Sequence, residues 1–265
     1  MRNVPKPVMA NSQHRFAIYD WIEGSGIAHA TAAEIHAAAR FLSCLSELRQ
    51  RPDSGCFGVA SEACFSGPEL LENLNCRLKR LLFRDENPEL QAFLEDKFRP
   101  SLKVISDWSR QQAGSSFDIE LNQDVRILSP SDFGFHNALQ TKGGDIFFLD
   151  FEYFGWDDLA KTISDFLLHP AMSLSPELKR SFVASVMESL PCQNDFEIRL
   201  KAFYPLFGLK WCLILLNEFL PEQLLRRRFA GNSHATRRTQ AEQLRKAEEK
   251  LQQTLTEYEH LPYID

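Results

Sequence analysis

Apolar residues recur every three or four positions along most of this chain, which is the pattern of amphipathic helices. A helix is predicted from Thr31 to about Gln50, because Thr31-Ala-Ala-Glu34 has the form of a capping box. Its apolar stripe consists of Ile35, Ala38, Leu42, Leu45 and Leu48. The same periodicity predicts helices at 68–83, 88–113, 158–169, 176–190 and 195–220.

Short β-prone runs interrupt the helical pattern near the N-terminus and in the middle of the chain. They fall at 4–8, 15–24, 126–129, 138–140 and 145–149. The last two runs are separated by Thr141-Lys-Gly-Gly144, whose glycines suit a tight turn, so we expect an antiparallel hairpin. Residues 153–157 are predicted to form a glycine-bearing turn. These elements together predict an α+β fold that is mostly helical.

Three oxygen-bearing side chains surround the predicted hairpin. Asn137 directly precedes its first strand, Asp150 directly follows its second, and Asp132 lies five residues before Asn137 in a loop. Because paired strands lie about 5 Å apart, the hairpin returns Asp150 to the vicinity of Asn137. A carboxylate and an amide oxygen suit Mg²⁺. Asp132 then remains free to accept a hydroxyl proton, so the spacing predicts a site for phosphoryl transfer.

This motif, Asp-x4-Asn followed by a hairpin and Asp150-Phe-Glu152, resembles the catalytic loop and metal-binding aspartate of the protein-kinase-like fold. In particular it resembles aminoglycoside phosphotransferases and choline kinases. The resemblance implies ATP as the donor, Asp132 as the catalytic base, Asn137 and Asp150 as Mg²⁺ ligands, and Glu152 beside the metal. That family usually has His-Gly where this chain has Pro130-Ser131. Because the family's histidine braces the loop by hydrogen bonding, its absence leaves unexplained what braces the loop in this chain.

The segment Tyr19-Asp-Trp-Ile-Glu-Gly24 resembles the hinge of the same family, whose backbone binds adenine. By position, the backbone of Asp20 and Ile22 would pair with the adenine edge. An edge strand with a solvent-facing Trp21 is the alternative. The family places a glycine-bearing phosphate loop, a strand lysine and a helix glutamate before the hinge, and the short stretch before residue 15 cannot hold them. We therefore expect 1–24 to be a remnant of the small lobe.

The remaining residues, 25–265, are expected to form the helical large lobe. It includes the catalytic loop at 129–152 and a charged tail from about 221 to 265. The tail contains Arg226-Arg-Arg228 and Arg237-Arg238, and a thin apolar seam that we expect to dock on the lobe or on a second subunit as a homodimer. The seam consists of Leu244, Leu251, Leu255 and Tyr258.

Three further charged residues are candidates for roles near the site. The family implies that an acidic residue after the metal motif anchors the catalytic loop, and Asp158 and Asp165 are both candidates. Asp158 is equally suited to cap the helix that follows it. Lys210 lies inside an apolar run, where we expect it either to extend to the surface or to lie near the acceptor pocket.

Composition limits the classes of function. The formal net charge of −6 argues against broad nucleic-acid binding. No 18-residue apolar stretch or signal-like N-terminus is present, so we expect a cytoplasmic protein outside the membrane. Six cysteines at wide spacing form no Cys-x-x-Cys pair, which favours reduced thiols over zinc ligands or a disulfide framework. They are Cys44, Cys56, Cys64, Cys76, Cys192 and Cys212.

Two functions from different classes therefore fit the sequence. The first is an ATP- and Mg²⁺-dependent phosphotransferase that acts on a hydroxyl of a sugar, an aminoglycoside-like compound or an amino alcohol. The second is a truncated or catalytically silent pseudokinase that acts as an interaction module, in which the motif serves folding. The sequence decides neither the acceptor nor the choice between ATP and GTP.

A third interpretation is a metal-dependent hydrolase that uses Asp132, His136, Asp150 and Glu152. It is disfavoured by the expectation that His136 points away from its neighbour Asn137, as adjacent residues usually do.

Overall fold

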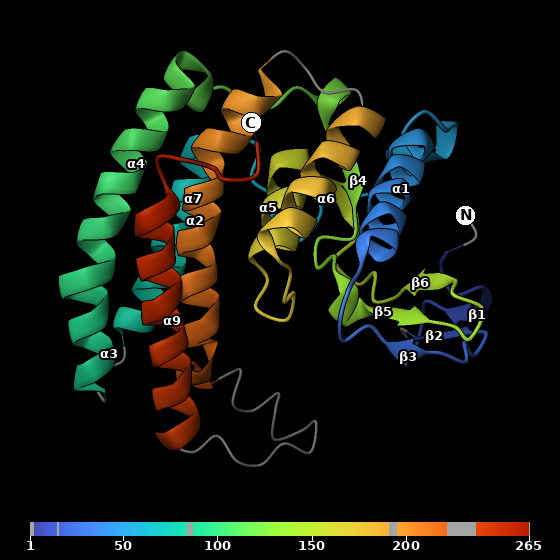
Figure 1. Cartoon of the computed structure of the whole chain (residues 1–265), viewed down its shortest axis with the longest axis horizontal. Coiled ribbons are helices and arrows are strands. Elements are labelled where there is room, and N and C mark those ends of the chain that lie inside the picture. The colour runs from blue at the N-terminus through green and yellow to red at the C-terminus, as the bar shows by residue number, and fades with distance from the viewer. Residues whose placement is uncertain (1–2, 15, 84–86, 191–194, 222–236, 265) are drawn as a thin grey trace. The chain divides into compact units, whose positions relative to one another are not determined.

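The computed structural model describes residues 3–14, 16–83, 87–190, 195–221 and 237–264, and these form two compact units (Figure 1). The first unit consists of 1–63, 123–193 and 262–265, and the second consists of 64–122 and 194–261. The first unit contains every strand that the structure describes, whereas the second is helical.

The first unit contains three small antiparallel sheets. One pairs β1 (Pro7–Asn11) with β2 (Phe16–Tyr19). The second has the order β3 (Ser25–Gly26), β5 (Ala138–Gln140), β6 (Ile146–Phe148). The third pairs β4 (Ile127–Ser129) with β7 (Gly155–Asp157).

The central hairpin is confirmed. β5 and β6 pair with Ala138 opposite Phe148, and Gly144 in the turn has a φ of +86°, which glycine adopts without strain. The pairing of β3 with β5 was not predicted. It depends on Gly24, because a Cβ there would lie 2.8 Å from the backbone oxygen of Gln140.

The prediction of a turn at 153–157 is wrong for its last three residues, which form β7. Gly155 allows this strand to lie against the 58–60 segment, because a Cβ on it would come within 2.5 Å of backbone atoms there. The amide of Ala60 donates to the carbonyl of Trp156 at 2.9 Å, and the amide of Trp156 donates to the carbonyl of Gly58 at 2.9 Å. Contact with a distant segment therefore decides the conformation.

Three helices complete the first unit, namely α1 (Ala32–Leu48), α5 (Leu159–Leu168) and α6 (Pro176–Ser189). The capping box at the start of α1 is confirmed, since the Thr31 side chain accepts a backbone amide and the Glu34 carboxylate accepts the amide of Thr31 at 2.7 Å. Phenylalanines fill the core between the helices and the hairpin. Phe41 lies 4.4 Å from Phe148 and Phe166 lies 3.8 Å from Phe182, measured between ring centroids.

The second unit consists of packed helical segments. They are α2 (Gly67–Leu82), α3 (Pro88–Ala92), a π-helical stretch (Phe93–Phe98), α4 (Arg99–Ala113), α7 (Phe196–Leu215) and α9 (Arg237–Glu257). The single regular helix predicted at 88–113 is wrong in its middle. Pro100 has no amide to donate and its ring crowds the carbonyl four residues earlier, which explains the wider π-helical turns before it.

Short 3₁₀ turns connect these elements. They lie at Pro52–Cys56, Gly114–Phe117, Gln123–Val125, Phe135–Asn137 and Leu216–Phe219.

α7 is the most buried helix of the second unit, as its apolar residues on several faces predict. Lys210 is only 2% exposed, so the expectation that its side chain extends to the surface is wrong. Among the described residues, 196–219 is one stretch long and apolar enough to cross a membrane, but most of it is buried inside the protein, as in the core helix of a globular domain.

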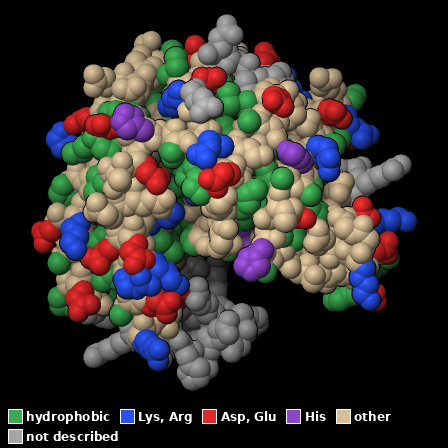
Figure 2. All heavy atoms as spheres, viewed as in Figure 1, with side chains coloured by type: hydrophobic (Ala, Val, Ile, Leu, Met, Phe, Trp, Pro, Cys, Tyr) green, Lys and Arg blue, Asp and Glu red, His purple; other side chains and the backbone are tan. Residues whose placement is uncertain are grey.

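α9 packs along α7 through its apolar seam, where Leu244 and Leu251 are buried, so the predicted docking on the lobe is confirmed. Opposite charges alternate on the exposed faces of α4 and α9, as Figure 2 shows, and Lys97 pairs with Glu248 at 2.7 Å. Residues 226–228 lie outside the described part of the chain, as does Cys192. The other five cysteines form no disulfide with one another.

Candidate active site

Asp132 lies in the loop that joins β4 to β5, and two phenylalanines fix this loop in the core. Phe133 and Phe135 are 3% and 4% exposed, and Phe133 stacks with Phe166 of α5 at 5.4 Å. Burial of the aromatic side chains on either side of Gly134 fixes the backbone of the loop against the core, and Asp132 lies just before the first of them. The loop is therefore held by packing, whereas Asp132 remains partly exposed.

Both His136 and Asn137 turn toward Asp132. His136 Nε2 lies 3.1 Å from Oδ1 of Asp132, and Asn137 Nδ2 donates to Oδ2 at 3.2 Å and to the Asp132 carbonyl at 3.0 Å. The expectation that His136 points away is wrong. The 3₁₀ turn at 135–137 places both side chains on the inner side of the loop, which the alternation of an extended chain would not.

Gly134 makes room for this arrangement. A Cβ on Gly134 would lie 2.6 Å from Nδ1 of His136 and 3.0 Å from Sδ of Met172. Any larger residue at 134 would therefore push the imidazole away from Asp132.

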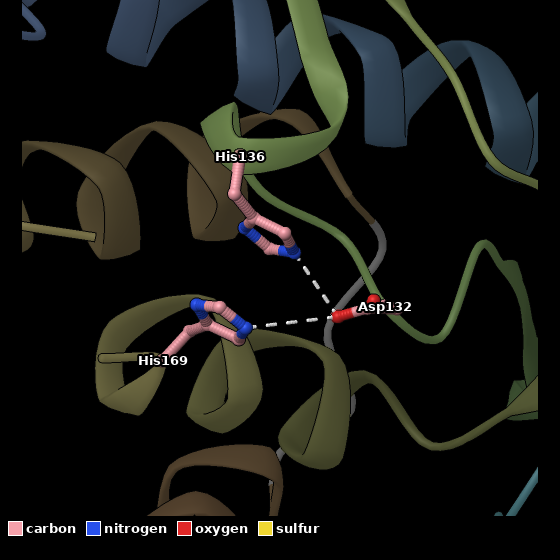
Figure 3. A group of neighbouring side chains, drawn as sticks. All are labelled: Asp132, His136 and His169. Carbon is pink, nitrogen blue, oxygen red and sulfur yellow. Dashed lines mark hydrogen bonds and ion pairs between the residues drawn. The ribbon is translucent and has the colours of Figure 1, made fainter. Parts of the chain in front are cut away.

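His169, at the end of α5, is a neighbour of Asp132 that the sequence did not reveal. Its ring stacks on that of His136 with centroids 3.8 Å apart and planes 1° from parallel, and its Nε2 lies 3.9 Å from Asp132 Oδ1 (Figure 3). Nδ1 of His169 accepts the amide of Ala171 at 3.1 Å, so in the neutral ring Nε2 carries the proton and faces the carboxylate.

One possible ligand atom each from Asp132, His136 and His169 lies within 4.8 Å of the other two, so these residues have to be tested as a metal site. Metal ions bind imidazole nitrogen along a lone pair that lies in the ring plane. Because the two rings are parallel and stacked, no point lies in both planes, and Nδ1 of His169 already accepts a hydrogen bond, which leaves Nε2 protonated. The cluster is therefore better suited to support Asp132 by hydrogen bonding than to hold a metal ion through both histidines.

This support keeps Asp132 ionised. The hydrogen bond with His136 is the largest influence on the pKa of Asp132 and lowers it, burial acts in the opposite direction, and His169 and Asn137 add to the lowering. The net pKa lies below the ordinary value for an aspartate. At neutral pH, Asp132 is thus a fixed carboxylate with two donors holding its orientation.

The hairpin brings Asp150 beside Asn137, as predicted. The amide of Leu149 donates to the carbonyl of Asn137 at 2.8 Å, so Asp150 is the next residue after this pair. Asp150 is exposed and has a φ of +61°, a left-handed conformation that non-glycine residues rarely adopt. Because Nδ2 of Asn137 donates to Asp132, the amide oxygen Oδ1 of Asn137 is not used in that contact.

Glu152 is exposed, two residues after Asp150.

The predicted hinge follows β2. The amide of Asp20 donates to the carbonyl of Lys6 at 2.9 Å, whereas 20–24 lies outside the strands and Trp21 is 90% exposed. The alternative is thus right about an exposed Trp21 but wrong about a strand. A cavity of about 280 Å³ lies between 23–25 and 140–142, at the end of the hinge.

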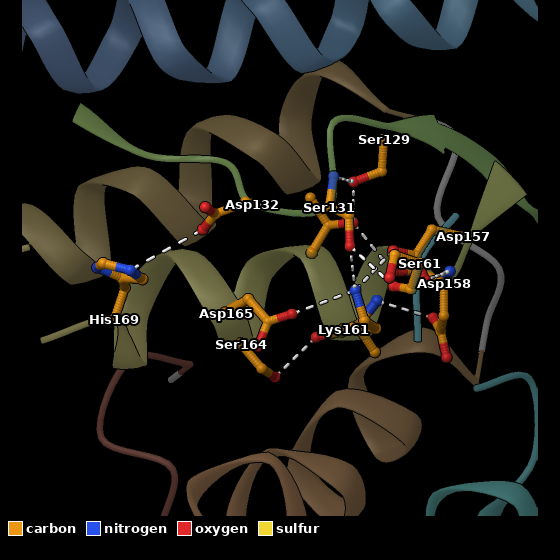
Figure 4. Close-up of polar contacts among 12 residues, drawn as sticks. Ser61, Ser129, Ser131, Asp132, Asp157, Asp158, Lys161, Ser164, Asp165 and His169 are labelled. Carbon is orange, nitrogen blue, oxygen red and sulfur yellow. Dashed lines mark hydrogen bonds and ion pairs between the residues drawn. The ribbon is translucent and has the colours of Figure 1, made fainter. Parts of the chain in front are cut away.

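A buried charged network lies behind the loop (Figure 4). Asp158 caps α5 through the amide of Ala160 at 2.8 Å, which confirms the capping interpretation. Asp165 instead contacts Lys161, which donates to Ser131 directly before Asp132. Sequence reasoning missed Lys161, because a lone lysine in an apolar helix gives no signal of its partners.

Comparison with protein-family models and with curated proteins gave no match. Solved structures do match. The match to a spectinomycin phosphotransferase in complex with ADP and spectinomycin covers 98% of this chain and 79% of the phosphotransferase chain, with a TM-score of 0.62 and 12% identity. The choline kinase LicA from Streptococcus pneumoniae covers 95% and 75%, with a TM-score of 0.58 and 11% identity. For an ADP-bound aminoglycoside phosphotransferase, APH(2'')-Ib, the values are 99%, 77%, 0.52 and 15%. The chain therefore has the protein-kinase-like fold of the aminoglycoside phosphotransferases and choline kinases, as its catalytic-loop motif predicted.

Proposed function

We propose that this protein transfers a phosphoryl group from ATP to a hydroxyl group of a small molecule. Asp132 is the base, Asn137 and Asp150 hold Mg²⁺, and the backbone of Asp20 and Ile22 pairs with adenine. The observation that carries the proposal is the arrangement around Asp132, where a carboxylate with a lowered pKa is oriented by Asn137 at the start of the hairpin that leads to Asp150.

Asp132 is suited to bind and orient the acceptor hydroxyl. Oδ1 faces the histidines and Oδ2 faces Asn137, so each oxygen retains a lone pair for one further hydrogen bond. The carboxylate can therefore accept the hydroxyl proton as the acceptor oxygen attacks.

Asn137 and Asp150 fit a divalent cation by their chemistry. The amide oxygen of Asn137 is left available when Nδ2 binds Asp132. Asp150 is exposed and directly follows Leu149, the residue whose amide pairs with the Asn137 carbonyl. Bound there, Mg²⁺ would neutralise charge on the transferring phosphate. The positive φ of Asp150 supports this role, because a strained conformation on a loop is more often retained for a ligand than for stability.

The structural neighbours support a choice among the acceptor classes. Those described above include a spectinomycin phosphotransferase and a choline kinase, whose named substrates carry hydroxyl groups together with amino or ammonium groups. A cationic acceptor of this kind also suits the net charge of −6. We therefore place an amino alcohol or an aminoglycoside-like compound ahead of a neutral sugar.

Nucleotide binding is the first test, since it needs no acceptor. At an ATP concentration of about 100 Kd, a ligand that binds only the folded state adds about 2.7 kcal/mol. For a chain of this length that corresponds to roughly 5–10 °C in Tm. We expect Mg²⁺-ATP to produce a shift of this order and EDTA to reduce it.

Asp150→Asn should remove most of the Mg²⁺-dependent part of the shift. Asp145→Asn is the matched control, because Asp145 is an exposed aspartate at the other end of β6. Equal shifts in the two variants would contradict the metal assignment of Asp150. If millimolar ATP has no effect on the unmodified chain, the silent interaction module becomes the better explanation.

Phosphoryl transfer is the second test. Purified protein is incubated with labelled ATP and with choline, ethanolamine, spectinomycin or gentamicin, and labelled products are separated. With an accepted substrate, Asp132→Asn should lower kcat by about 10²–10⁴-fold, the usual contribution of a general base, whereas Asp145→Asn should not. A fall of less than tenfold for Asp132→Asn would contradict its role as base.

A further inference from the structure

Lys161 is a buried ammonium group on α5, directly behind the loop that carries Asp132. The residue is 1% exposed, yet all three hydrogens of the ammonium have an acceptor within reach. Nζ lies 2.8 Å from Oδ2 of Asp157, 3.2 Å from Oδ2 of Asp165 and 3.1 Å from Oγ of Ser131 (Figure 4). Two of these acceptors are carboxylate oxygens, and the third belongs to the catalytic loop.

Ser131 is the residue on which this contact acts. It directly precedes Asp132 and has a φ of +67°, which side-chain-bearing residues rarely adopt. Its Oγ accepts from Lys161 and donates to the carbonyl of Ser61 at 3.0 Å, and its amide donates to Oγ of Ser129 at 3.1 Å. The left-handed conformation is thus fixed by side-chain contacts from two other segments of the same unit.

The helix contributes a second contact one residue further on. The Thr162 hydroxyl lies 3.0 Å from Oγ of Ser129, and Ser129 is fully buried at the end of β4. α5 therefore holds the loop at both Ser129 and Ser131, immediately before the candidate base.

The charges make a purely stabilising role a poor explanation. Burial alone would lower the pKa of Lys161, but Asp157 and Asp165 outweigh it and raise that pKa, so the ammonium stays charged. Burial also raises the pKa of Asp157 in spite of its contact with Lys161, so charge at this site is held against a desolvation cost. Buried ion pairs contribute little stability compared with well-packed apolar residues, and their best-attested use is to specify one arrangement.

We propose that Lys161 is a positioning residue, whose ammonium fixes Ser131 in its left-handed conformation and thereby directs the Asp132 carboxylate. The Lys161–Ser131 contact supplies the bracing that the Pro130-Ser131 sequence left unexplained. The consequence for catalysis rests on the proposed function, whereas the positioning of the loop does not.

Hydrogen–deuterium exchange of the peptide 129–137 in the full chain tests the positioning directly. Ser131→Ala removes the hydroxyl that Lys161 contacts and leaves the Lys161, Asp157 and Asp165 trio intact. Ser164→Ala is the matched control, since Ser164 is a fully buried serine of α5 whose hydroxyl donates to the Ala160 carbonyl of its own helix. We expect Ser131→Ala to speed exchange of the loop amides about tenfold or more, from the loss of a hydrogen bond to a charged group.

Lys161→Met should have the same effect on the loop. If that variant does not fold, the comparison of Ser131→Ala with Ser164→Ala still decides the matter. Loop exchange in Ser131→Ala within twofold of the unmodified chain would overturn the proposal, as would an equal rise in Ser164→Ala.

Kinetics separate positioning from general destabilisation. With an accepted acceptor, Ser131→Ala should lower kcat by about tenfold or more and leave KM for ATP within twofold, because misdirection of the base affects the chemical step. An unchanged kcat with faster loop exchange would overturn the positioning role. If the unmodified chain transfers no phosphate to any acceptor, the proposed function fails, and exchange alone decides whether Lys161 holds the loop.

Discussion

Replacement of Gly134 by Ala offers a direct test of how the histidine pair supports Asp132. The backbone of Gly134 is extended, with φ of 172° and ψ of 177°, so alanine meets no conformational barrier there. The whole effect must come from the added methyl group. Its Cβ would lie 2.6 Å from Nδ1 and 2.7 Å from Cε1 of His136.

The size of the effect follows from these distances. In protein structures, about nine in ten contacts between a Cβ atom and another heavy atom are longer than 3.4 Å. The imidazole must therefore move by about 0.8 Å, the difference between 3.4 and 2.6 Å. A movement of that size is enough to break the 3.1 Å bond from His136 to Asp132. A hydrogen bond to a charged group contributes about 1.5–3 kcal/mol, and overpacking costs a similar amount, so we expect Gly134→Ala to destabilise the protein by about 2–3 kcal/mol.

Urea unfolding of Gly134→Ala, His136→Ala and the double variant measures this. In the His136→Ala background the methyl group has lost its main steric partner, so the cost of Gly134→Ala should fall by at least about 1 kcal/mol. The contact with Met172 remains in both backgrounds and sets the residual cost. A cost that differs by less than about 0.5 kcal/mol between the backgrounds would refute the reasoning.

Two further predictions concern elements that place the loop. Glu34→Gln should destabilise by about 1 kcal/mol at pH 7. The Thr31 hydrogen bond lowers the pKa of Glu34 from its ordinary value of 4.5, so this contribution is fully present above pH 4.5 and is lost as the pH falls through the folded-state pKa. Urea unfolding at pH 7 and at a series of lower pH values should show the difference shrink below pH 4.5, and a constant difference would contradict it. Gly155→Ala should cost about 2–3 kcal/mol, because its Cβ would meet backbone atoms at 2.5 Å, whereas Gly58→Ala, where nothing lies within 4 Å, should cost under about 1 kcal/mol by the same assay. Equal costs for the two glycines would show that the approach of these segments is not tight.

Local sequence predicted the elements that depend on neighbours in the chain. The capping box of α1, the cap of α5 at Asp158 and the hairpin turn with Gly144 were all predicted, because each is formed by residues within four positions of one another. The irregularities were missed. β7 exists because Gly155 packs against a segment almost a hundred residues earlier, which no local pattern records.

The candidate site divides in the same way. The sequence shows the spacing of Asp132, Asn137 and Asp150 around a predicted hairpin. In the structure, Leu149 pairs with Asn137, and Asp150 is the residue that follows Leu149. His169 and Lys161 were not legible as site residues. They lie 37 and 29 residues after Asp132 in the sequence, and neither belongs to a motif of fixed spacing.

The sequence by itself thus predicted the fold, most of the helices and the central hairpin, and it supplied the oxygen-bearing residues of the proposed phosphoryl-transfer site. Only the tertiary structure decided what holds Asp132, namely His136, the stacked His169, and Lys161 acting through Ser131. The reason is physical. Backbone hydrogen bonds and turns depend on adjacent residues, whereas the orientation of a partly buried carboxylate depends on which side chains the packed core brings against it.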